Sequence, residues 1–473
     1  MNYLIKNSQI KIFFIGIGGI GMSGIAELMS DQGYKISGSD LIINNNIKRL
    51  KKKGIKIYIG HKKTNIKSIT LAVFSSAIKN DNPEIKRCKE LKIPLLSRAD
   101  MLAELMRFKK CIAVAGSHGK TTTTSLVGSI LEYSKLDPTI VNGGIINAYS
   151  KNNRLGKSSL MVVESDESDG SFLKLPHEIN IITNIDIEHL DYYKTKKNIL
   201  NSFEKFITSI PFYGYSILCI SDLNTYKISK KIDTRRIITY GYELSKADVR
   251  ISNIYQNQSS TSFKLLIKKN IIRKYSGYYN FNVNLLGVHN VLNATGAIIA
   301  SLLVGAKLSK IKKSLNEFKG IKRRFTFIGK KNEAMIYDDY AHHPTEIQAS
   351  YEIAKHIAEK RIIVIFQPHR FSRTRDLYDK FIKVLKRVDI LYIYDIYPAG
   401  EKKIKNINSV KLVKDLKIFK NKVYYLNKSA NLNSELESYF YEKNLIIFMG
   451  AGSITNEANK LVEKNDRKIK RVR

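Results

Sequence analysis

Short apolar runs alternate with amphipathic stretches along the whole chain. The first part contains the runs KIFFIGI, YKISGSD, IKIYIG and LAVFSSAI, and the helical stretch SRADMLAELMRF follows them at 97–108. Apolar runs separated by helical stretches are typical of a parallel sheet covered by helices. The pattern therefore predicts an α/β domain over 1–107.

The same alternation restarts twice. A new apolar strand begins at Cys111, the runs SLMVVES, INIITNI, YSILCIS and RIITYGY follow it, and a helix over 289–306 closes this part. The stretch 248–286 alternates as strands do but carries no recognisable chemistry. From Ile321 a third series contains EAMIYDDY, RIIVIFQP, ILYIYDIYP and NLIIFMGAGS. We predict three successive α/β domains, over 1–107, 108–320 and 321–473.

Charge and cysteine content narrow the class of protein. The chain has 80 Lys and Arg against 42 Asp and Glu, a net charge of +38. The lysines are spread evenly beside abundant isoleucine and asparagine, which favours compositional drift over a nucleic-acid-binding surface, and only the tail at 465–473 is a concentrated basic run. Three cysteines without paired spacing predict no disulfide and no zinc site, as in a reducing cytoplasm.

No membrane span is predicted. The uncharged stretch 12–26 is too short to cross a bilayer and carries five glycines, so a strand that enters a turn explains it better. We expect a soluble, cytoplasmic protein with no membrane or nucleic-acid partner.

A glycine-rich turn lies close to the N-terminus. Gly16, Gly18 and Gly21 fit the pattern GxGxxG after a strand and before a helix, where a backbone turn and a helix N-terminus receive a diphosphate. Asp40 ends the next strand, at the position where an acidic residue meets a ribose hydroxyl. The motif alone indicates a Rossmann-like domain, and a nicotinamide dehydrogenase remains open.

A second loop has the GK[ST] core of a phosphate loop. Gly119, Lys120 and Thr121 open a helix, but Val114 stands where the longer Walker pattern has its first glycine, so the loop is a shortened form that starts at Gly116. Backbone amides and Lys120 would hold the phosphates of a nucleoside triphosphate, and a threonine hydroxyl would reach Mg²⁺. A dehydrogenase has no use for this loop.

An ordered series of motifs resembles the Mur ligases, ATP-dependent enzymes that add amino acids to the muramic acid of peptidoglycan precursors. The motifs are GIGGIGMSGIAE, AGSHGKTTTT, VNGG, ESDESDGSF, TNIDIEHLD, HNVLNA, DDYAHHPTE, FQPHRFSRTRDLY and IYPAGE. The resemblance covers nearly the whole chain. It implies a Rossmann-like N-terminal domain for a UDP-sugar, a central P-loop-type ATPase domain with a mostly parallel sheet, and a Rossmann-like C-terminal domain for an amino acid.

The resemblance also implies a reaction. ATP and Mg²⁺ would drive the ligation of L-alanine to the lactyl carboxylate of UDP-N-acetylmuramate through an acyl phosphate, in a monomer or homodimer whose domains close by hinge motion. Ala341 leaves a second activity of the family open, because the muropeptide-recycling ligase, which joins a tripeptide to the same UDP-sugar, tends to carry alanine there. Arg370 and Arg373 favour L-alanine, since two arginines can grip its small carboxylate.

The resemblance assigns residues to five roles. For catalysis it points to Lys120, Glu164, His189 and Arg324. For ATP it points to Gly116, Ser117, His118, Gly119, Lys120, Thr121, Thr122, Asn290, Asn293 and Asp339. For the UDP-sugar it points to Gly16, Gly18, Gly19, Gly21, Ser39 and Asp40. For the amino acid it points to His369, Arg370 and Arg373. For Mg²⁺ it points to Thr121, Glu164 and His189.

Overall fold

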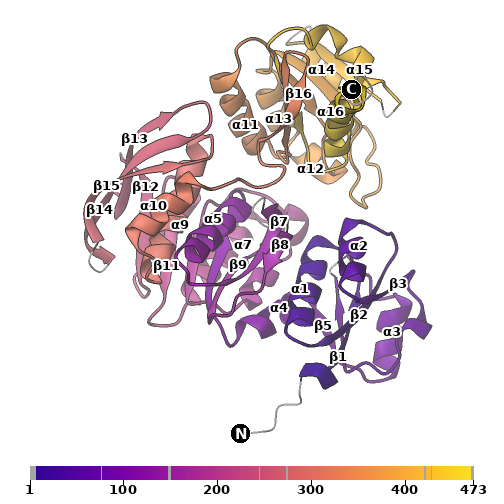
Figure 1. Ribbon diagram of the computed structural model, residues 1–473, viewed down its shortest axis with the longest axis vertical. Helices are drawn as coiled ribbons and strands as arrows, with labels where there is room; N and C mark the ends of the chain where they lie inside the picture. Colours follow the sequence, from indigo (N-terminus) through magenta and orange to yellow (C-terminus); the bar gives the residue numbers. More distant parts are fainter. Residues whose placement is uncertain are drawn as a thin grey trace. The chain divides into compact units, whose positions relative to one another are not determined.

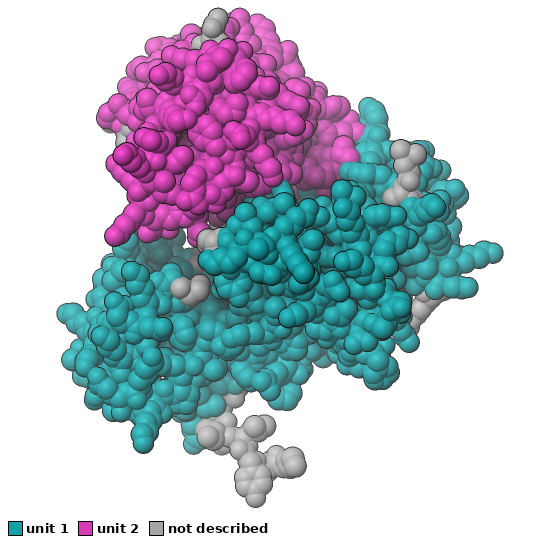
Figure 2. Space-filling view, turned by 180° about the vertical axis from the view of Figure 1, so that it is seen from behind, with its two compact units in different colours: residues 1–255, 260–284, 290–319 teal, residues 256–259, 285–289, 320–473 magenta. Residues whose placement is uncertain are grey.

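The structure is a computed structural model that describes residues 7–75, 77–146, 151–243, 246–272, 275–419, 422–427 and 429–469. The strands in these ranges form three sheets. The chain divides into two compact units, of which unit 1 comprises 1–255, 260–284 and 290–319 and unit 2 comprises 256–259, 285–289 and 320–473 (Figure 2). Unit 1 contains the first two sheets and unit 2 contains the third.

The first sheet of unit 1 is parallel throughout, in the order β3-β2-β1-β4-β5. Its strands are β1 (Lys11–Ile15), β2 (Lys35–Asp40), β3 (Lys56–Ile59), β4 (Leu71–Phe74) and β5 (Leu95–Ser97). The helical segments around it are η1 (Asn7–Gln9), α1 (Ile20–Asp31), α2 (Asn45–Lys52), η2 (Lys63–Asn65), α3 (Pro83–Glu90) and α4 (Arg98–Met106). The four predicted strands are present, and the sequence did not predict β5 because three residues carry too little periodicity.

The second sheet of unit 1 has the order β15-β14-β13-β12-β11-β10-β6-β9-β7-β8. Its strands β11 to β15 are labelled in Figure 1. Its strands are β6 (Lys110–Ala115), β7 (Thr139–Ile146), β8 (Lys151–Arg154), β9 (Leu160–Glu164), β10 (Ile179–Ile182), β11 (Tyr215–Cys219), β12 (Ile237–Tyr242), β13 (Val249–Gln256), β14 (Thr261–Ile272) and β15 (Tyr275–Val283). The segment from β13 through β12, β11, β10, β6 and β9 to β7 is parallel. The alternating stretch at 248–286 forms β13 to β15, of which the last two pair antiparallel.

Helices cover both faces of this sheet. They are α5 (Lys120–Tyr133), η3 (Ser171–Lys174), α6 (Leu190–Tyr193), α7 (Lys196–Thr208), α8 (Leu223–Ser229), α9 (Val288–Leu303) and α10 (Leu308–Asn316). On one face Phe203 and Phe206 of α7 pack on Ala113 and Ile182. On the other face α9 approaches so closely that a Cβ at Gly296 would lie 3.1 Å from the side chain of Ile181. Burial on both faces explains why these strands are continuously apolar.

Unit 2 contains a sheet in the order β16-β17-β21-β18-β19-β20, parallel except for β16 at its edge. Its strands are β16 (Thr326–Lys331), β17 (Ala334–Asp339), β18 (Ile362–Phe366), β19 (Ile390–Tyr394), β20 (Val423–Leu426) and β21 (Leu445–Met449). Its helical segments are α11 (Pro344–Ile357), α12 (Phe371–Asp376), α13 (Tyr378–Leu385), α14 (Ser409–Lys417), α15 (Leu432–Glu435), η4 (Glu437–Tyr439) and α16 (Ile454–Ile469). One buried cluster joins the sheet to α11, α13 and α14, and another joins it to α15 and α16.

The predicted α/β class with mostly parallel sheets is confirmed. The exact boundaries at 107/108 and 320/321 stay predictions. In the described part of the chain no helix is both long and apolar enough to cross a bilayer. The three cysteines are unpaired and buried. Residues 470–473 of the basic run at 465–473 lie outside the described residues.

Candidate functional site

The phosphate loop follows β6 and opens α5. Val114 and Ala115 of β6 pair with Glu164 of β9 on one side and Ile182 of β10 on the other, so both neighbouring strands end beside the loop. Ligands of open α/β sheets bind at the carboxyl ends of the strands. The predicted phosphate loop therefore lies at the position where this fold receives a ligand.

The loop is shaped by two glycines with positive φ. Gly116 has a φ of 135°, and a Cβ there would lie 2.2 Å from the hydroxyl of Thr183. Gly119 has a φ of 83°, and a Cβ there would lie 2.4 Å from the amide oxygen of Asn293. Any side chain would collide at either position, so both glycines are required by conformation and by space.

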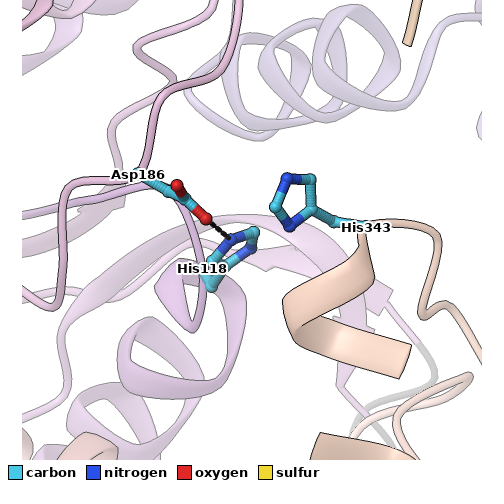
Figure 3. A group of neighbouring side chains, drawn as sticks. All are labelled: His118, Asp186 and His343. Atoms are coloured by element: carbon cyan, nitrogen blue, oxygen red, sulfur yellow. Dashed lines mark ion pairs between the residues drawn. The ribbon is translucent and has the colours of Figure 1, made fainter. Parts of the chain in front are cut away.

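The segment after β10 fixes the loop from one side. Asn184 Oδ1 accepts from the His118 amide at 2.9 Å, and Thr183 Oγ1 donates to the His118 carbonyl at 2.6 Å. The amide of Asp186 donates to Ser117 Oγ at 2.8 Å. The His118 ring also pairs with the Asp186 carboxylate at 3.5 Å (Figure 3). These bonds hold the loop in shape before any phosphate binds; His343, drawn in the same figure, caps α11 in unit 2.

Lys120 is bonded to its own loop and to a buried carboxylate. Its Nζ donates to the carbonyls of Gly116 at 2.6 Å and Ser117 at 3.1 Å, and pairs with Glu167 at 2.8 Å. Burial alone would lower the pKa of Lys120, but Glu167, Asp166 and Glu164 outweigh it and hold that pKa above its usual value. Burial raises the pKa of Glu167 to about 7, against the opposing effect of Lys120. Lys120 is thus a permanent cation at the phosphate loop.

Two of the three predicted Mg²⁺ ligands lie together. Thr121 Oγ1 donates to Glu164 Oε1 at 3.1 Å, and Glu164 Oε2 accepts from the amide of Gly143 at 2.6 Å. A hydroxyl and a carboxylate oxygen fit the preference of Mg²⁺ for oxygen ligands. His189 instead lies 3.9 Å from Glu167 and 3.8 Å from Glu188, and the ligand atoms of these three residues are within 4.8 Å of one another.

Asn293 supports the phosphate loop from the side of α9. It is 5% exposed, its Nδ2 donates to Asn290 Oδ1 at 3.0 Å, and its Oδ1 accepts from Thr123 of α5 at 3.3 Å. Together with its contact at Gly119, this places Asn293 against the loop itself. Adenine contact by Asn290 and Asn293 stays a prediction.

The glycine-rich turn after β1 uses most of its amides internally. The amides of Gly16 and Ile17 both donate to the carbonyl of Ser39 at 2.9 Å, and the amide of Gly18 donates to Asp40 Oδ2 at 2.8 Å. The carboxylate of Asp40 also accepts from the amide of Leu41. Asp40 therefore braces the turn. The first amides of a helix have no intrahelical acceptor, so the start of α1 is where this motif would receive an anion. A ribose contact by Asp40 stays a prediction.

Ser39 is fully buried beneath this turn. Its hydroxyl donates to Glu84 at 2.6 Å instead of facing solvent. Ser39 is thus placed to support the turn from below, and its predicted contact with the UDP-sugar is untested.

The predicted amino-acid residues lie in unit 2 after β18. Arg373 Nη1 donates to His369 Nδ1 at 3.2 Å, and the ring of Tyr397 stacks on His369 at 5.5 Å. Burial, then the positive charges of His342, Arg373, Arg370 and Arg323, lower the pKa of His369 to about 3. Because Arg373 can only donate, Nδ1 accepts and the neutral ring carries its proton on Nε2. His369 is thus arranged as a hydrogen-bond donor.

Two further predicted residues of unit 2 are engaged within the unit. Arg324 lies over the ring of Tyr340 at 5.3 Å and is 3.8 Å from Glu346. Asp339 is 5% exposed, bonds to Ser350, and has its pKa raised to about 6 by burial. The roles predicted for Arg324 in catalysis and for Asp339 at the ribose stay predictions.

Sequence reasoning gave no role to several residues of this site. They are Glu84, Asn142, Thr183, Asn184, Asp186 and Glu188. Most of them directly follow a strand that neighbours β6, and their position after that strand was the available signal. Glu84 had no such signal, because its contacts come from distant segments.

Comparison with known proteins identifies the class. Three family models match in chain order: "Mur ligase family, catalytic domain" over 11–110, "Mur ligase middle domain" over 114–301, and "Mur ligase, glutamate ligase domain" over 323–452. The chain belongs to the Mur ligase family, as its motifs predicted.

Several relatives carry the name of one member of the family, UDP-N-acetylmuramate–L-alanine ligase. The UDP-N-acetylmuramate–L-alanine ligase of Rickettsia bellii is 45% identical over 462 residues, which is 96% of each chain. The crystal structure of the UDP-N-acetylmuramate–alanine ligase of Thermotoga maritima has a TM-score of 0.80 at 28% identity and covers 97% of this chain and 100% of its own. A murein peptide ligase of Psychrobacter arcticus, at a TM-score of 0.72 and 23% identity over 96% of this chain and 98% of its own, shares the fold.

Proposed function

We propose that this protein joins L-alanine to the lactyl carboxylate of UDP-N-acetylmuramate at the expense of ATP, in peptidoglycan precursor synthesis. The observation that carries the proposal is the 45% identity, over 96% of the chain, to a protein named UDP-N-acetylmuramate–L-alanine ligase. The preformed phosphate loop and the separate glycine-rich turn support it. The phosphate loop receives the triphosphate of ATP, and the glycine-rich turn receives the diphosphate of the UDP-sugar. The reaction takes place in the cytoplasm.

The reaction proceeds in two steps, phosphoryl transfer to the carboxylate and then attack of the amine on the acyl phosphate. The carboxylate oxygen attacks the γ-phosphorus of ATP, and the bond between that phosphorus and the β,γ-bridging oxygen breaks. ADP departs, and the substrate carboxylate has become an acyl phosphate. The alanine nitrogen then attacks the acyl carbon, loses a proton, and displaces inorganic phosphate as the amide forms. The protein contributes positioning and charge neutralisation, as in other phosphoryl transfers.

The residues of unit 1 hold the triphosphate. Lys120 is the nearby cation, and it exchanges its bonds to the Gly116 and Ser117 carbonyls for phosphate oxygens. Amides in the first turn of α5 add further donors. Thr121 and Glu164 offer adjacent oxygen ligands for Mg²⁺, which neutralises phosphate charge when bound. His189 with Glu167 and Glu188 is a second ligand group.

The residues of unit 2 hold the amino acid. Arg370 and Arg373 grip the α-carboxylate, and His369 donates from Nε2 to orient it. Since Nδ1 of His369 is already occupied by Arg373, orientation of the amino acid is favoured over uptake of a proton from its amine.

ADP release tests the function directly. The purified protein is given Mg²⁺, ATP and UDP-N-acetylmuramate, with either L-alanine or the L-Ala-γ-D-Glu-diaminopimelate tripeptide. We expect release that depends on L-alanine. Release only with the tripeptide would assign the protein to cell-wall recycling, and no release with either would contradict both activities.

A further inference from the structure

A buried carboxylate lies beneath the glycine-rich turn. Glu84 stands in the first turn of α3 with its side chain fully buried. Its Oε2 accepts from Ser39 Oγ at 2.6 Å and contacts His61 Nδ1 at 2.7 Å, and its Oε1 accepts from Asn65 Nδ2 at 2.7 Å. The helix N-terminus adds a favourable dipole for the negative charge.

The three partners come from β2 and from the connection between β3 and β4 in the first sheet. Ser39 lies near the end of β2, His61 follows β3, and Asn65 ends η2. Asn65 also donates to the carbonyl of Gly60 at 3.1 Å. Glu84 thus ties together segments that approach the carboxyl ends of the parallel strands, where ligands of such sheets bind.

The link from Glu84 to the turn runs through Ser39. The hydroxyl of Ser39 is held by Glu84, while its carbonyl accepts the amides of both Gly16 and Ile17 at 2.9 Å. A shift of Ser39 would therefore move the first two residues of the turn directly. Ser39 Oγ also lies 3.0 Å from His61 Nδ1, so the hydroxyl is located from two directions.

The cost of burying a carboxylate argues for a role beyond stability. A buried charge must be taken out of water, and well-packed apolar residues often stabilise a core as well or better. Of the partners of this charge, Ser39 bonds directly to the turn, while His61 contacts Ser39 and Asn65 donates to the carbonyl of Gly60. We propose that Glu84 is a positioning residue for the UDP-sugar, which fixes Ser39 and thereby the shape in which the glycine-rich turn receives the diphosphate.

This inference rests on the proposed function, and its test measures substrate binding apart from turnover. Titration calorimetry follows UDP-N-acetylmuramate without ATP, and steady-state kinetics give KM for each substrate. For Glu84→Gln we expect the Kd and KM for the UDP-sugar to rise about tenfold, as for loss of a charge-assisted hydrogen bond, while kcat and the KM for ATP stay within about twofold. A purely structural defect would change the ATP parameters as well.

Two further variants sharpen the test. Ser39→Ala removes the hydroxyl while the carbonyl remains, and it should weaken the UDP-sugar in the same way; the double variant should be no weaker than Glu84→Gln alone, because both act through one bond. Glu90→Gln, an exposed carboxylate on the same helix with partners Lys63 and Arg87, is the matched control and should leave all parameters unchanged.

The outcomes separate this inference from the function itself. Unchanged UDP-sugar binding in Ser39→Ala, and in Glu84→Gln where it folds, would overturn the role of Glu84; so would an equal rise in the KM for ATP. If Glu84→Gln does not fold, Ser39→Ala decides. Wild-type protein that binds the UDP-sugar but releases no ADP with L-alanine would contradict the function, while the binding series would still decide the role of Glu84.

Discussion

Lys120 joins the phosphate loop to the acidic residues after β9. Its Nζ contacts two loop carbonyls and Glu167, so removing it leaves a buried carboxylate without its cation. Lys120→Ala should lower kcat by at least about a hundredfold, the scale seen when one preorganised charge partner is lost. UDP-sugar binding, measured by calorimetry, should stay near normal because the glycine-rich turn belongs to another sheet.

The matched control for this variant is Lys110→Ala, which removes an exposed lysine at the start of the same β6 strand. It should keep wild-type turnover. Lost UDP-sugar binding in Lys120→Ala would show that the phosphate loop and the glycine-rich turn are assigned to the wrong substrates.

The depressed pKa of His369 makes unit 2 sensitive to acid. Its pKa is about 3 in the folded protein, whereas a free histidine has about 6.5, so below pH 6.5 the unfolded chain binds a proton that the folded one does not. Stability is therefore lost as the pH falls from 6.5, by about 1–2 kcal/mol at pH 5. Urea unfolding at pH 7.5, 6 and 5 should show a shallower acid loss for His369→Asn, and equal slopes in the two proteins would contradict the shifted pKa.

Side chains whose partners are close in sequence could be predicted, and those with distant partners could not. Gly119, Lys120 and Thr121 form one turn of backbone, so their pattern specifies their geometry. Glu84 meets Ser39 over 45 positions, and Lys120 meets Glu167 over 47, and no local pattern records such distances. Roles that depend on tertiary burial, such as that of Ser39, escape a sequence motif.

At the scale of elements, the junction from β6 through the loop to α5 depends on Gly119. Gly119→Ala places a Cβ at positive φ, which costs about 1 kcal/mol, and also drives it into the Asn293 side chain. We expect the KM for ATP to rise by about tenfold or more, because the loop must shift before phosphate can bind. Kinetics with varied ATP at saturating UDP-sugar measure this effect.

Gly54→Ala is the matched control for this element. Gly54 has a similar φ of 80°, but nothing lies within 4 Å of the Cβ it would carry. It should lower the melting temperature slightly and leave the KM for ATP unchanged. If both variants raise that KM equally, a general loss of stability and not the geometry of the phosphate loop is responsible.

Strands formed by continuous apolar runs were predictable, and several short or polar strands were not, although the edge strand β3 was predicted from its run IKIYIG. The buried strands β1, β6, β10, β18 and β21 are continuous apolar runs, because helices cover both faces of their sheets. The strands β5, β7, β8, β16 and β20 are short, polar or at a sheet edge, so their pairing comes from neighbours and not from their own residues. The strands β13 to β15 were visible as the alternating stretch 248–286, but their function was not.

At the scale of the whole molecule, the excess of positive charge is the dominant feature. The sequence carries 80 basic against 42 acidic residues, so the average charge pair is repulsive and the compact state confines that repulsion. Raising the salt from about 0.01 M to about 0.1 M shortens the Debye length from about 30 Å to about 10 Å and screens it. The melting temperature should therefore rise by a few degrees over this range.

Differential scanning fluorimetry in NaCl and in KCl measures this effect, and agreement between the two salts excludes a specific effect of the cation. Local pairs such as Lys411 with Asp415 act in the opposite direction, because screening weakens an exposed attraction. A melting temperature that falls with salt would mean that such pairs outweigh the net charge. A rise would mean that repulsion among the excess lysines destabilises the fold, as expected of compositional drift. Anionic ligands bound at the phosphate loop and at the glycine-rich turn should then stabilise the protein, in part because they reduce this repulsion.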